Sequence, residues 1–63
     1  MDDEKFNMSM RKFLKQVGVT SQQQIEKAVR DSGKTSGTVA VKVVLSGADV
    51  GLEHVVEGEI ELG

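Results

Sequence analysis

The hydrophobic period of this chain changes once, and this change limits the fold to a helical first half followed by strands. Up to residue 32, the apolar residues recur at the three- and four-residue spacing of an amphipathic helix. From Thr38 onward they alternate with other residues, which is the period of a strand with one covered face. The sequence therefore predicts an α+β fold in which helices precede an antiparallel hairpin.

The apolar residues of the first segment form one stripe along a helix predicted at about residues 3–17. The stripe consists of Phe6, Met10, Phe13, Leu14 and Val17. Acidic residues near its start and lysines near its end suit the helix dipole. Gly18 follows where a helix commonly ends on a left-handed glycine. Residues 18–20 are therefore predicted to form a corner between two helices.

The second predicted helix spans about residues 21–32. Thr20 or Ser21 would cap its start, because each has a glutamine three positions later, as in a capping box. Its apolar residues share one face: Ile25, Ala28 and Val29. Gly33 is predicted to end this helix, and residues 33–37 are predicted to form a flexible connector.

Two strands are predicted at about residues 38–46 and 52–62, joined by a glycine-flanked turn. The pairing of the strands must keep the apolar side chains on one face, because a slip by one residue would expose all of these side chains to water. The favoured register places Leu45 opposite His54, Lys42 opposite Glu57 and Val44 opposite Val55. The two helices are expected to cover the apolar face of this hairpin, since an isolated hairpin is only marginally stable.

The length of the chain predicts a single small domain, residues 1–63, that needs help to cover its apolar surface. A chain of 63 residues buries only about 60% of its unfolded surface. The sequence has no cysteine, so disulfides cannot stabilise it. Its only aromatic residues are Phe6 and Phe13. Association with a second copy is therefore an expected source of stability.

The net charge of −2 divides unevenly along the chain. Residues 1–34 carry seven basic and five acidic side chains, a net charge of +2, whereas residues 35–63 carry one and five, a net charge of −4. Such an asymmetry can favour self-association or the approach of a partner. The simpler interpretation, which we prefer, is that each element has a solvated charged face.

The chain is expected to be a soluble, cytoplasmic protein. It begins with Met1 followed by three acidic residues, unlike the basic start and apolar run of a signal peptide. No apolar stretch approaches the roughly 18 residues needed to cross a membrane.

Most of the sequence resembles an uncharacterised family of short bacterial proteins. The similarity lies in residues 6–9, 11–15, 17–22 and 25–30, with the pattern FNMSxRKFLKxVGVTSQxxIEKAVR, and in residues 56–60 near the end. Because the family has no known function, the resemblance implies no catalytic or binding residue.

A basic face on the first helix supports an alternative function, as an accessory protein that binds nucleic acid. The face contains Lys5, Arg11, Lys12 and Lys15. The segment around Gly18 also resembles a helix-turn-helix motif, but Leu14 stands where that motif usually has a small residue, and Gln24 where it has a branched apolar one. The acidic overall charge argues further against nucleic acid as a partner.

The remaining polar residues predict no enzyme, no cofactor and no metal site. Glu57, Glu59 and Glu61 lie on one face of a flat strand, which spreads carboxylates rather than converging them on a cation. His54 is expected to be a structural residue at the edge of the apolar face. A Gly-Lys-Thr run at residues 33–35 lacks the upstream glycine of a phosphate-binding loop.

The favoured function is therefore a small non-catalytic protein-interaction module of unknown biological role. We expect its partner to be another protein or a second copy, as a homodimer paired through open strand edges, and we expect no membrane or small-molecule substrate. The residues proposed for this surface are Lys12, Lys15, Lys42, Val44 and Val55.

Overall fold

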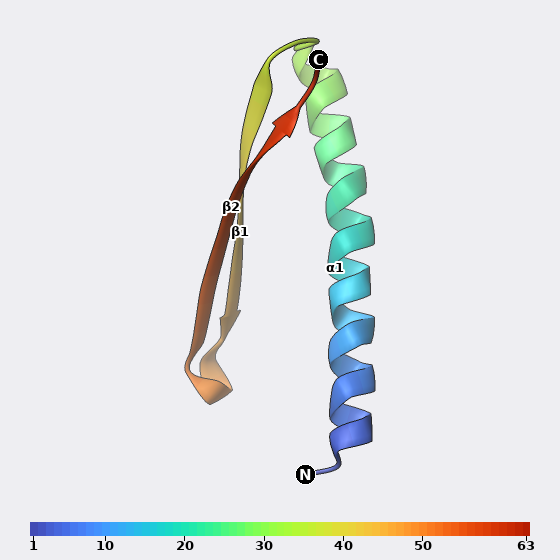
Figure 1. Ribbon diagram of the computed structural model, residues 1–63, viewed down its shortest axis with the longest axis vertical. Helices are drawn as coiled ribbons and strands as arrows, with labels where there is room; N and C mark the ends of the chain where they lie inside the picture. Colours follow the sequence, from blue (N-terminus) through green and yellow to red (C-terminus); the bar gives the residue numbers. More distant parts are fainter.

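The computed structural model, which describes residues 1–63, consists of one long helix beside a two-stranded hairpin (Figure 1). Helix α1 spans Asp3–Ser32, and strands β1 (Thr38–Gly47) and β2 (Leu52–Glu61) form the antiparallel hairpin. A single 3-10 turn, η1 (Ala48–Val50), joins the strands. The prediction of an α+β fold with an N-terminal helical half and a C-terminal hairpin is confirmed.

The prediction of two helices, at 3–17 and 21–32, is wrong because α1 runs without a break through Gly18. Gly18 does not have the positive φ that a left-handed helix end requires. The hydroxyl of Thr20 donates a hydrogen bond of 2.8 Å to the carbonyl oxygen of Gln16, and so it caps no second helix. A glycine inside a helix costs only about 1 kcal/mol relative to alanine. That cost is too small to break a helix that contains no proline and is rich in strong helix formers at residues 10–16 and 22–30.

Both ends of α1 have a capping group that the sequence supplies. At the start, the side chain of Asp2 accepts a hydrogen bond of 3.1 Å from the backbone N–H of Lys5. At the other end, Gly33 adopts a φ of 75° and donates its N–H to the carbonyl oxygen of Arg30. The prediction that Gly33 ends the helical half is therefore confirmed.

Replacing Asp2 with alanine is expected to lower the free energy of unfolding by about 1 kcal/mol, because an N–H at the helix start loses its acceptor. Chemical denaturation at one fixed protein concentration measures the change. Asp3→Ala is the control, since Asp3 lies in the first turn and is not the capping residue. It should cost about 0.5 kcal/mol or less through the helix dipole alone. Equal losses for the two variants would contradict the capping role of Asp2.

The hairpin has the predicted register along its whole length. Leu45 lies opposite His54, Lys42 opposite Glu57 and Val44 opposite Val55. Beyond the last pair, Leu62 donates its N–H to the carbonyl oxygen of Gly37 over 2.8 Å, and Gly37 donates to Gly63 over 3.2 Å. These bonds tie the C-terminus of the chain to the connector at residues 33–37.

No residue of the single chain is buried. The residues that are half-buried on α1 are Val17, Ser21, Ile25 and Val29, and those on or next to the hairpin include Val39, Val41, Leu45, Ile60 and Leu62. The hairpin lies close to α1 near the connector and diverges from it toward the turn (Figure 1). The molecule is accordingly elongated, with extents of 47 × 20 × 17 Å. The two apolar faces cover each other only in part.

Candidate interaction surface

Three of the five predicted surface residues lie together on the face of the hairpin that points away from α1. Val44 and Val55 are opposite each other, with 64% and 49% of their surfaces exposed, and Lys42 lies opposite Glu57 on the same face. Alternation along the strands places these side chains opposite to the half-buried Val41 and Leu45. These three residues therefore share one exposed face, and their role in binding a partner stays a prediction.

The other two predicted residues, Lys12 and Lys15, lie on α1 and do not join that surface. The half-buried positions from Val17 to Val29 mark the side of the helix that faces the hairpin. At about 100° per residue, Lys12 falls on the opposite side of the helix and Lys15 on its flank. The structure therefore separates the predicted surface into two regions that face away from each other.

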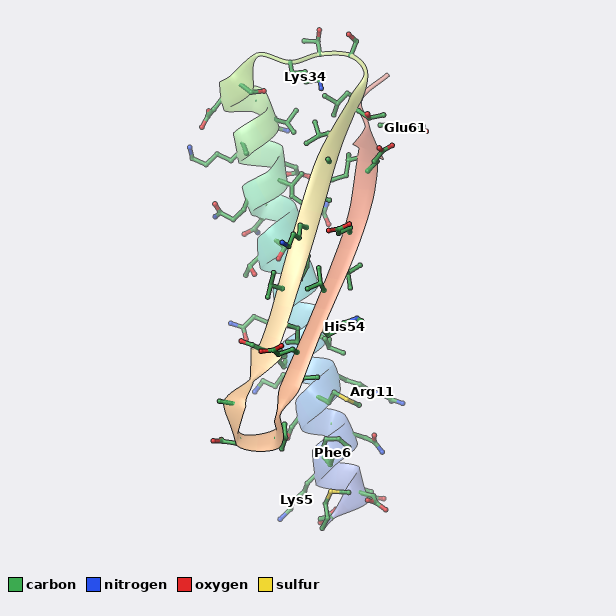
Figure 2. All side chains as sticks on the ribbon, turned by 90° about the vertical axis from the view of Figure 1, so that its left-hand side faces the viewer. Lys5, Phe6, Arg11, Lys34, His54 and Glu61 are labelled. Atoms are coloured by element: carbon green, nitrogen blue, oxygen red, sulfur yellow. The ribbon has the colours of Figure 1, made fainter.

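The basic residues of α1 spread over a wide arc of the helix. Figure 2 shows the side chains of Lys5 and Arg11 leaving the helix on different sides. The helical period places Lys12 near Lys5, and Lys15 lies between Lys12 and Arg11, three and four residues from them. All four side chains are exposed, but the chain as a whole carries a net charge of −2, which does not favour nucleic acid as a partner.

The histidine and the glutamates form no converging site. His54 lies across from Leu45, on the apolar face where it was predicted, but its side chain is exposed (Figure 2). Glu57 and Glu59 border a shallow hollow of about 510 Å³ over Gly58 on the hairpin. In the whole chain, no group of three or more histidine, aspartate or glutamate side chains comes together as a metal site would require.

The structure exposes a set of large apolar side chains that the sequence predicted to be covered. On α1 they are Phe6, Met10, Phe13 and Leu14, each 41% to 51% exposed, and on the inner face of the hairpin they are Val43, Leu52 and Val56, each 40% to 52% exposed. Most of them lie toward the end where the hairpin diverges from the helix (Figure 1). Single exposed apolar residues are common in proteins, whereas large groups of them are typical of surfaces that bind another molecule.

The helical period alone could not reveal this surface. The same spacing describes a stripe that covers a hairpin and a stripe that binds another chain. The nearest signal in the sequence is the position of both phenylalanines in the first half of α1.

Helix α1 is 30 residues long, but it is not apolar enough to cross a membrane.

Comparison with known proteins places the sequence in a family without assigned activity. The model of DUF6494, described as a family of unknown function, matches residues 1–63. This match agrees with the resemblance found in the sequence to a family of short proteins without known function. No curated protein and no solved structure matches the chain significantly.

Proposed function

This chain belongs to DUF6494, a family of unknown function, and on that premise we propose that it is a small non-catalytic protein-interaction module that associates with itself. The observation that carries the proposal is that the single chain buries none of its 63 residues. A folded domain is stabilised mainly by apolar surface removed from water. A second chain can supply the cover that the first chain lacks.

The exposed area of the chain supports a partner of about its own size. A compact protein of 6.8 kDa is expected to expose about 4,000 Å², whereas this chain exposes 5737 Å². The excess is about 1,700 Å² per chain, or about 3,500 Å² for two, which lies within the range of obligate dimers. The radius of gyration, 15.3 Å, also exceeds the roughly 11 Å of a compact chain of this length.

The hairpin offers an additional route to self-association. The two-stranded sheet has order β1-β2, so the outer edge of each strand carries unpaired backbone groups. Lys42 and its glutamate neighbours limit uncontrolled pairing along these edges, but they allow pairing with one specific copy.

Sedimentation equilibrium should give a molecular mass of twice 6.8 kDa at high concentration, falling toward the mass of one chain on dilution. Because folding is coupled to association, the helical circular dichroism signal should decrease over the same range. Each tenfold dilution favours the separated chains by about 1.4 kcal/mol. A single chain that keeps its full helical signal at millimolar concentration would contradict the proposal.

A further inference from the structure

The first half of α1 carries an apolar face with the spacing of a coiled coil. Its four residues, which we call the N-terminal seam, are Phe6, Met10, Phe13 and Val17, at successive separations of four, three and four. This spacing follows the period of 3.5 residues at which two helices pack side by side. The next two positions of the same pattern are Thr20 and Gln24, so the apolar seam ends after Val17.

The N-terminal seam lies on the part of α1 from which the hairpin diverges (Figure 1). The half-buried positions of the helix are spaced four residues apart, at Val17, Ser21, Ile25 and Val29. Steps of four residues move about 40° around a helix each time, so this line turns away from the seam. The two lines share only Val17. The hairpin therefore covers the second half of α1 and leaves the seam open, with Phe6 at 50%, Met10 at 41% and Phe13 at 51% exposure.

We propose that the N-terminal seam packs against the same seam of a second copy, with the two α1 helices antiparallel. The proposal rests on the self-association proposed above and names the surface that mediates it. The separations of four, three and four read the same in both directions along the helix. An antiparallel pair therefore places Phe6 opposite Val17 of the partner subunit, and Met10 opposite Phe13 of the partner subunit. One patch meets its own copy, as a two-fold dimer requires.

The charges around the seam favour the antiparallel direction. Asp2, Asp3 and Glu4 precede the seam, and a parallel pair would place both sets of carboxylates side by side. In an antiparallel pair centred on the seam, the two copies of Asp3 are separated by about 25 Å along the helix axis. The positions that flank the seam carry no charge, since they are Asn7, Ser9, Leu14 and Gln16. Close approach of the helices therefore buries no charged group.

Packing of a second copy on the seam accounts for the exposed apolar surface better than pairing of strand edges does. Pairing of strand edges satisfies backbone groups but leaves the two phenylalanine rings in water. Packing of the seams covers these rings, and it also brings the second copy toward the inner face of the hairpin, where Val43, Leu52 and Val56 are exposed. The excess exposed area, about 1,700 Å² per chain, matches one side of a large homodimer interface.

Disulfide trapping tests the direction and position of the seam directly, because the chain has no cysteine of its own. The double variant Phe6→Cys with Val17→Cys should form a covalent dimer under mild oxidation. These two positions are about 16 Å apart within one helix, too far for an internal disulfide. Each single variant should remain uncrosslinked, since residue 6 meets residue 17 of the other copy rather than itself.

The matched control is Met8→Cys with Val19→Cys. This pair has the same separation of eleven residues, and both side chains are exposed, at 72% and 49%, on the side of α1 away from the seam. It should give no covalent dimer. The proposal is overturned if the control pair crosslinks as readily, if either single seam variant crosslinks, or if the seam pair fails to crosslink at concentrations where the wild-type protein is dimeric.

A charge placed in the seam should weaken the dimer. Phe13→Glu is expected to raise the dissociation constant about 30-fold or more, as for a central aromatic anchor. Val19→Glu is the matched control, because Val19 lies outside the seam and is about as exposed as Phe13, at 49% against 51%. This variant should change the dissociation constant by about threefold or less. A dimer that is unaffected by Phe13→Glu would overturn the seam and leave self-association intact. A folded wild-type monomer would overturn both proposals.

Discussion

Replacing Gly18 with proline is expected to lower the free energy of unfolding by at least about 3 kcal/mol. Gly18 lies in the interior of α1, fifteen residues after the first helical position and fourteen before the last. Proline there removes a helical N–H donor, and its ring collides with the carbonyl of the residue four positions earlier. Urea denaturation followed by circular dichroism measures the loss. A variant as stable as the wild type would contradict a continuous helix.

Gly18→Ala is the matched control at the same position, and it should stabilise the protein by about 1 kcal/mol. A Cβ atom added to Gly18 meets no other atom within 4 Å, and the φ angle of Gly18 is not positive. If Gly18 instead formed the corner of two helices in a left-handed conformation, alanine would destabilise the chain. The sign of the change therefore separates the two arrangements. A destabilising Gly18→Ala would support the corner.

Replacing Val29 with aspartate is expected to lower the free energy of unfolding by about 2 to 3 kcal/mol. Val29 is half-buried, and it borders a hollow of about 310 Å³ together with Val39 of β1. The substitution removes apolar contact between α1 and the hairpin and places a carboxylate against apolar side chains. The carboxylate also lies in the last turns of the helix, where the dipole disfavours it. Chemical denaturation at constant protein concentration measures the change.

Val19→Asp is the matched control, because it makes the same substitution on the same helix at a side chain that is 49% exposed. It should cost about 0.5 kcal/mol, mainly through helix propensity. Equal losses for the two variants would mean that the hairpin does not pack on α1 through Val29.

The alternation of the strands together with cross-strand complementarity was sufficient to predict the hairpin and its register. Alternation decides which side chains share a face, and the pairing of Lys42 with Glu57 then selects one register. Gly33 was also predictable as a helix end, since the helical period stops there. The same reasoning failed at Gly18, because a glycine can end a helix or lie within one at a cost of about 1 kcal/mol. The balance depends on the packing of the residues on both sides, which local sequence does not contain.

The candidate surface was predictable only in part. Strand alternation was sufficient to place Val44, Val55 and Lys42 on one face of the hairpin. Lys12 and Lys15 were joined to them without knowledge of how α1 lies against the hairpin. The exposed N-terminal seam was interpreted as part of a core, because the helical period does not reveal what covers an apolar stripe.

The sequence by itself determined the type and order of the elements, the glycine end of the helical half and the strand register, since each of these depends on local period and on neighbouring residues. The tertiary structure decided that the helix is continuous and that the hairpin covers only its second half. The rotation of a long straight helix explains the second result. Its apolar residues drift around the axis, so one hairpin cannot face all of them. Phe6, Met10 and Phe13 are left in the uncovered first half of α1, where a second chain can reach them.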